Sequence, residues 1–154
     1  MLSEFIVVMV IAKQKMKTIR SYSELILLPT FEERFEYLKL GGVVGRETFG
    51  SRRYVNQKFY TSPEYRKLKR EVILRDNGLD LGVDDHAISG PIIIHHMNPI
   101  VLEDILEHSQ FAWSPEYLIS VSSLTHKAIH YSNIDLLPKP FTQRQPNDTC
   151  PWRR

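Results

Sequence analysis

The chain has 154 residues, of which 42% are apolar and 25% are charged, and its formal net charge is +2. These are ordinary values for one globular domain, and the length gives no basis for a second one. The single cysteine, Cys150, excludes a disulfide scaffold and a cysteine-based structural zinc site, and it favours a reducing compartment such as the cytoplasm.

The charges are unevenly distributed along the chain. From Arg34 to Arg75 there are eleven Lys or Arg against four Asp or Glu, whereas residues 76–126 contain eight acidic residues and neither Lys nor Arg. A basic half followed by an acidic, histidine-bearing half suits a protein that binds phosphates with one surface and a divalent cation with another. For the acidic half, an ordinary solvated surface is an equally good interpretation.

The two ends of the chain are interpreted as peripheral. Residues 2–12 are apolar, but they are few for a membrane span, and basic residues follow them rather than precede them, which predicts neither a signal peptide nor a membrane anchor. We interpret residues 1–15 as an extension ahead of a second natural start at Met16; the competing interpretation is an extra strand or helix packed on the domain. Residues 144–154 are a polar, proline-containing tail.

The first elements predicted after this extension are a helix and a strand. Residues 30–42 form a short helix in which Thr30 and Glu33 make a capping box and Gly41 marks the end. Residues 54–60 alternate between apolar and polar side chains, which predicts a strand.

Residues 62–78 carry the clearest helix signal in the chain, with Ser62 as the cap, Pro63 at the first helical position and Asn77-Gly78 as the end. The predicted core stripe is Tyr65, Leu68 and Val72. Basic side chains on this helix and just before the predicted strand are candidate contacts to a DNA backbone: Arg52, Arg53, Arg66, Lys67 and Arg70. An ordinary solvated surface explains the helix charges about equally well.

Four of the six histidines fall in two short segments. His95 and His96 are neighbours in an apolar run that predicts a buried strand, and a strand sends them to opposite faces, so they cannot do the same job. His126 and His130 are spaced i, i+4, which places both on one face of a helix. One strand histidine converging on this pair would make a three-imidazole metal site with open coordination positions, as catalysis requires. The other would be free to take a proton.

The segments around these histidines receive simpler interpretations. Residues 81–91 are predicted to be a loop, and residues 101–113 a short helix with three inward side chains, Leu102, Ile105 and Leu106. The two other histidines of this half, His86 and His108, are interpreted as loop or surface residues.

The histidine segments resemble the HNH endonucleases with a ββα-metal motif, in particular the phage-encoded members of that superfamily. The pair His95-His96 matches the dyad on the family's first strand, residues 118–120 match its second strand, and residues 126–130 match its helix. The arrangement of three ligand histidines is most similar to the nuclease domains of the colicins.

This resemblance implies an α+β fold with a single small domain, residues 16–143, in which a ββα-metal core of about residues 90–133 is embedded among helices. It implies His96 as the general base and three metal ligands, His95, His126 and His130. Where the family has an asparagine that pins the loop between the two strands, this sequence has Tyr117.

The implied activity is metal-assisted hydrolysis of a DNA phosphodiester bond in the cytoplasm of a bacterial host. The implied cofactor is a divalent ion, and an all-imidazole ligand set favours Zn²⁺, Ni²⁺, Co²⁺ or Mn²⁺ over Mg²⁺. A phage terminase or another packaging protein is the implied partner. Two alternatives stay open: a non-catalytic HNH-fold protein that binds DNA or a packaging complex, which Tyr117 favours, and a metal-dependent RNase.

Overall fold

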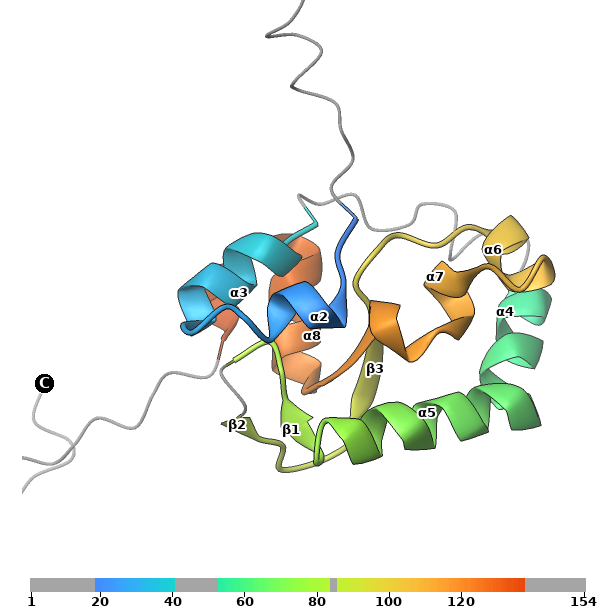
Figure 1. Cartoon of the computed structure of the whole chain (residues 1–154), viewed down its shortest axis with the longest axis horizontal. Helices are drawn as coiled ribbons and strands as arrows, with labels where there is room; N and C mark the ends of the chain where they lie inside the picture. Colours follow the sequence, from blue (N-terminus) through green and yellow to red (C-terminus); the bar gives the residue numbers. More distant parts are fainter. Residues whose placement is uncertain (1–18, 41–52, 84–85, 138–154) are drawn as a thin grey trace, which may run out of the picture.

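The computed structural model describes residues 19–40, 53–83 and 86–137. The proposed N-terminal extension, the Gly41 helix end, Arg52 and the C-terminal tail lie outside these ranges. Within them the fold is α+β, as the sequence predicts, with seven α-helices around two two-stranded sheets (Figure 1). No helix in this part of the chain combines the length and the apolar character that a membrane span needs.

The centre of the fold is an antiparallel pair of strands, β3 (Ile93–His96) and β4 (Leu118–Val121), with Ile93 opposite Val121 and His96 opposite Leu118. Helix α5 (Pro63–Arg75) covers one face of this pair, and helix α8 (Ser123–Tyr131) covers the other. The side chains divide accordingly. Ile94 and Leu118 pack in a cluster with residues of α5, whereas Ile93, Ile119 and Val121 pack in a cluster with Ile129 of α8.

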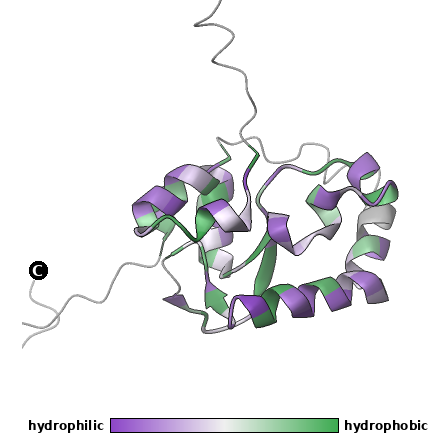
Figure 2. Ribbon diagram, viewed as in Figure 1, coloured by the Kyte–Doolittle hydropathy of each residue, from purple (hydrophilic) through white to green (hydrophobic). Residues whose placement is uncertain are grey.

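Helix α5 forms where the sequence predicts it and for the predicted reasons. The Ser62 side chain accepts a hydrogen bond from the backbone N–H of Tyr65, and Pro63 occupies the first turn. Tyr65, Leu68 and Val72 are its buried residues, so hydrophobic and hydrophilic residues alternate around the helix in Figure 2. Asn77 and Gly78 end it in the left-handed region, with φ of 53° and 68°.

The remaining helices extend the two layers. Helices α2 (Tyr22–Leu25) and α3 (Phe31–Leu38) add Leu25 and Leu38 to the cluster under α8. The capping box of Thr30 and Glu33 begins α3 as predicted. On the α5 side, the core is completed by α4 (Arg53–Thr61), α6 (Leu102–Leu106) and α7 (Gln110–Trp113).

Short elements join these layers. Strand β1 (Leu79–Asp80) follows α5 and pairs with β2 (His86–Ala87). The predicted loop 81–91 therefore contains one short strand. A 3₁₀ turn, η1 (Pro115–Tyr117), leads into β4, and another, η2 (Ile134–Leu136), follows α8.

The predicted strand over residues 54–60 is wrong, because this segment belongs to helix α4. A helix satisfies its own backbone hydrogen bonds, whereas a strand here would need a partner strand. From the helix, the Phe59 ring reaches the core and contacts the rings of Tyr65 and Trp113.

The predicted helix over residues 101–113 is two helices, α6 and α7, separated at His108, which has a φ of 53°. Ile105 is buried as predicted, but Leu106 is 62% exposed and does not point inward. The break explains this difference, since two short helices present different faces to the core than one continuous helix would.

Candidate metal centre

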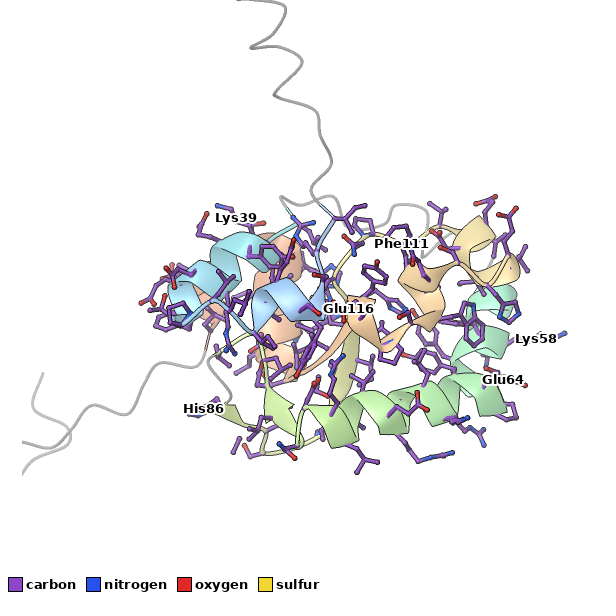
Figure 3. The ribbon with its side chains drawn as sticks, viewed as in Figure 1. Lys39, Lys58, Glu64, His86, Phe111 and Glu116 are labelled. Carbon is purple, nitrogen blue, oxygen red and sulfur yellow. The ribbon has the colours of Figure 1, made fainter. Side chains whose placement is uncertain are left out.

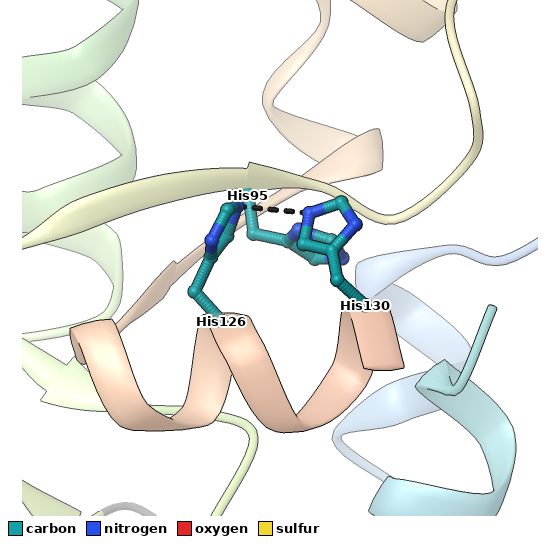
Figure 4. A group of neighbouring side chains, drawn as sticks. All are labelled: His95, His126 and His130. Atoms are coloured by element: carbon teal, nitrogen blue, oxygen red, sulfur yellow. Dashed lines mark hydrogen bonds between the residues drawn. The ribbon is translucent and has the colours of Figure 1, made fainter. Parts of the chain in front are cut away.

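Three of the four histidines singled out in the sequence converge in the structure. Strand β3 supplies His95, and helix α8 supplies His126 and His130 (Figure 4). One ring nitrogen of each residue lies within 4.8 Å of the others, and this group could hold a metal ion. The ring centroids are 5.3 Å apart for His95 and His126, 5.1 Å for His95 and His130, and 4.2 Å for the helical pair.

Local structure explains this convergence. The odd-numbered residues of β3 face α8, so the strand turns His95 toward the helix. The Ser122 side chain caps α8 by accepting from Thr125 N–H, and the helix then places His126 and His130 one turn apart on the same face.

The three imidazoles are poised in the neutral form that binds a metal. Burial, with the neighbouring histidines, holds the pKa of His95 well below its usual range. Burial and the nearby His130 lower the pKa of His126 to about 4, and burial lowers the pKa of His130. Proton competition for these nitrogens is therefore weak near neutral pH.

The positions of the ring nitrogen atoms are compatible with a bound cation. His95 Nε2 is buried without a hydrogen-bond partner among the described residues. The Nε2 atoms of His126 and His130 face each other at 2.9 Å. Two ligand nitrogens of a tetrahedral zinc site would lie about 3.3 Å apart, given zinc–nitrogen distances near 2.0 Å, so a shift of a few tenths of an ångström accommodates the ion.

His96 lies on the opposite face of β3. Its ring centroid is 6.1 Å from that of Phe59, within the aromatic layer that α4, α5 and α7 build. Burial lowers the pKa of His96 to about 4, opposed in part by a hydrogen bond with the backbone of Ala112 and by the charge of Asp104. Its Nε2 is buried without a described partner. The structure thus separates the two neighbouring histidines, as strand alternation predicts, and does not add His96 to the group of three.

Tyr117 contributes backbone contacts between the strands. Its carbonyl accepts from Met97 N–H at 3.0 Å, which extends the β3–β4 ladder, and its own N–H donates to the Ser114 carbonyl at 3.1 Å. The Tyr117 ring contacts that of Phe111, with centroids 4.9 Å apart. Its side chain does not bridge the loop in the way that the family's asparagine is expected to.

Two residues that were not predicted from the sequence, Arg75 and Asp76, fix the backbone around Tyr117 at the start of β4. The Arg75 guanidinium donates to the carbonyls of Pro115 and Leu118 at 2.6 and 2.7 Å, on either side of Tyr117. The buried Asp76 carboxylate accepts from Arg75 Nε and from Ser120 N–H, both at 2.7 Å. The sequence gives one local sign of these two residues, an Arg-Asp pair directly after the apolar stripe of α5. Their hydrogen-bond partners, however, lie forty residues or more along the chain.

A third residue that was not predicted from the sequence is Asn98, which is 7% exposed. It connects the loop after β3 to Arg20, near the start of the described residues. Its side chain accepts from the backbone N–H of Arg20 and donates to the carbonyl of the same residue, both at 2.8 Å. The Arg20 guanidinium continues the connection by donating to the carbonyls of Tyr37 and Lys39.

The other candidate residues lie apart from the three histidines. Arg66, Lys67 and Arg70 are exposed on the face of α5 that points away from the sheet. Arg53 begins α4, and Arg52 lies outside the described residues. His86 lies on the outside of the molecule (Figure 3), and His108 is exposed and stacks on Trp113 with centroids 4.6 Å apart, as the surface interpretation predicts.

Comparison of the chain with protein-family models gave no match, and neither a search of curated proteins nor a search of solved structures gave one.

Proposed function

We propose that this protein is a metal-dependent endonuclease of the HNH type that hydrolyses DNA phosphodiester bonds. The observation that carries the proposal is the convergence of His95, His126 and His130, with neutral imidazoles. His95 comes from the first strand of the antiparallel pair, and the other two come from the helix that follows the second strand. The order of strand, strand and helix is the order that the resemblance to this superfamily requires.

The three histidines would hold a divalent ion by three nitrogen atoms and leave coordination positions for substrate and water, the pattern of catalytic rather than closed structural sites. An all-nitrogen ligand set favours Zn²⁺, Ni²⁺, Co²⁺ or Mn²⁺ over Mg²⁺. When bound, the ion supplies a Lewis acid toward a phosphate oxygen.

In this proposal His96 accepts the proton of the attacking water. Its Nε2 has no described hydrogen-bond partner, and its lowered pKa keeps the ring neutral above about pH 4. The ring nitrogen is therefore open to accept a proton, but it is a weaker base than that of an exposed histidine.

Two observations favour a second candidate function, a non-catalytic metal-binding protein of the same fold that binds DNA or a phage packaging protein. The His96 ring faces the aromatic layer on the α5 side of the strand, and Tyr117 stands where the superfamily has asparagine. In that case metal would stabilise the fold without supporting cleavage.

The decisive experiment combines metal binding with plasmid cleavage. Protein stripped with chelator is resupplied with Zn²⁺, Ni²⁺, Co²⁺, Mn²⁺ or Mg²⁺. The variants are His126→Ala, His96→Ala and, as a matched control, His108→Ala, an exposed histidine outside the group. We expect wild type to bind metal and cleave DNA, His126→Ala to lose at least about a hundredfold in metal affinity, and His96→Ala to bind metal without cleaving.

The control variant should match wild type in both assays. Metal binding without cleavage by wild type would select the second candidate, and full cleavage by His96→Ala would remove its role as base. Absence of metal binding by folded wild type would contradict both functions. RNA tested in parallel separates a DNase from an RNase.

A further inference from the structure

A buried carboxylate at the N-terminus of α8 lies outside the group of three histidines. Asp80, at the end of β1, is 2% exposed. One of its oxygens accepts from Ser122 N–H at 2.9 Å and from the Thr125 hydroxyl at 2.7 Å; the other accepts from Gly82 N–H at 3.1 Å. The carboxylate therefore bonds to the helix cap and to the residue immediately before His126.

The chain just after Asp80 fits closely against the same helical turn. A Cβ atom added at Gly82 would lie 2.4 Å from Thr125 Cγ2, well inside any normal contact, and 3.6 Å from Ile129 Cδ1, an ordinary contact. Thr125 is completely buried, so it has little freedom to move away. The absence of a side chain at Gly82 is what allows α8 to sit this near β1.

The same segment is also fixed to the central strands. Leu81 N–H donates to the Ser120 carbonyl of β4 at 3.1 Å, and β4 pairs with β3, where Ile119 is opposite His95. Residues 80–82 thus contact both the sheet that carries His95 and the helix that carries His126 and His130. These contacts connect the strand histidine to the helical pair through residues 80–82.

We propose that Asp80 and Gly82 are positioning residues of the metal centre, which fix α8 against the sheet so that the three ligand nitrogens meet at one ion. The proposal rests on the metal binding proposed above. The Asp80 carboxylate does this through Ser122 and Thr125, and Gly82 does it through the space it leaves for the Thr125 methyl group.

The first test is a compensating pair of substitutions read by Co²⁺ titration and by the visible absorption of the Co²⁺ complex, which reports ligand geometry. Gly82→Ala alone should displace α8, lower Co²⁺ affinity at least about tenfold and alter the absorption. Thr125→Ser removes the methyl group that the new Cβ would meet and keeps the hydroxyl. The double variant should therefore return to within about threefold of Thr125→Ser alone, with its spectrum.

A second test removes the Thr125 hydroxyl in case Gly82→Ala fails to fold. Thr125→Val keeps the shape of the side chain and removes both the donor to Asp80 and the acceptor of the Ser122 hydroxyl, whereas Thr125→Ser keeps both. We expect weaker Co²⁺ binding and an altered spectrum for the valine variant alone. The stability control is Ile105→Ala, a core truncation on α6, which should lower the unfolding midpoint and leave the spectrum unchanged.

The outcomes separate this proposal from the proposed function. If wild type binds Co²⁺ and both Gly82→Ala and Thr125→Val keep its affinity and spectrum, the positioning role is overturned while the metal centre stands. If Ile105→Ala changes the spectrum as much as Gly82→Ala, a general loss of stability explains the effect, and the positioning role is again overturned. If folded wild type takes up no Co²⁺, the proposed function fails and this proposal fails with it.

Discussion

At the residue scale, His96 shows how a buried imidazole makes the stability of the fold depend on pH. The ring lies among aromatic side chains, and burial holds its pKa at about 4, so the folded protein keeps it neutral across most of the acidic range. In the unfolded chain a histidine has a pKa of about 6.5. Between these two values the unfolded chain binds a proton that the folded protein does not.

This difference predicts a pH dependence of stability in the metal-free protein. Because the unfolded state binds more protons between about pH 6.5 and pH 4, the free energy of unfolding should fall as the pH falls through that window, and His96 should contribute nothing further below it. His95, His126 and His130 act in the same direction, since their pKa values are also lowered.

The measurement is urea unfolding at several pH values with chelator present, for wild type and for His96→Gln. The variant should show a shallower decrease in unfolding free energy than wild type, because glutamine cannot take up the proton. Parallel curves for the two proteins would show that the His96 ring is not held neutral by the fold.

At the element scale, the entry into β4 is stabilised by a side chain from α5. The Arg75 guanidinium, its side chain 22% exposed, bonds to the carbonyls of Pro115 and Leu118, pairs with Asp76, and lies over the Tyr22 ring with Cζ 3.7 Å from the centroid. A planar guanidinium can make these contacts at once, which an ammonium group cannot. It fixes the backbone on both sides of Tyr117.

Replacing Arg75 by methionine is therefore expected to destabilise the protein by about 2–4 kcal/mol, because two carbonyls lose a charged donor and the buried Asp76 loses its cation. The matched control is Lys67→Met on the exposed face of the same helix, which should change stability by less than about 0.5 kcal/mol. Denaturant unfolding of both variants measures this. Equal effects of the two substitutions would show that Arg75 is an ordinary surface charge.

The difference between local signals and long-range hydrogen bonds explains how much of the structure could be predicted from the sequence. Helices α3 and α5 are predictable because their caps and apolar stripes are local signals. Helix α8 and the three-histidine group follow from the i, i+4 spacing of His126 and His130 and from the alternation of the strand before them. The roles of Asp76, Asp80 and Asn98 could not be found in this way. Each acts through hydrogen bonds to residues 42 or more positions away, and even the neighbouring Arg75-Asp76 pair gives no sign of which distant backbone groups it binds.

The two wrong predictions have a related cause. Residues 54–60 alternate like a strand, but alternation over so short a run also occurs in a helix, and the choice depends on whether a partner strand is present. Over residues 101–113 the helical pattern gave no sign of the break at His108, where the left-handed φ of 53° ends the first helix.

At the scale of the whole molecule, the sheet separates two kinds of surface. The three histidines lie between β3 and α8, whereas Arg66, Lys67 and Arg70 project from the outer face of α5, on the other side of the strands. A straight duplex bound against the histidines would therefore meet α8 and its neighbours rather than this basic face. The geometry favours the solvated-surface interpretation of the α5 charges over the DNA-contact interpretation.

For the DNA binding proposed above, this arrangement predicts how affinity depends on salt. Each phosphate contact contributes about 0.9 to the slope of log affinity against log salt, so three contacts from α5 would contribute about 2.7. Since these residues point away from the histidines, the combined variant Arg66→Gln, Lys67→Gln and Arg70→Gln should lower the slope by less than about one. Affinity is measured by fluorescence anisotropy on a duplex at several salt concentrations, with metal present. A slope lower by about 2.7 would instead assign DNA binding to α5 and require the duplex to pass over both faces of the sheet.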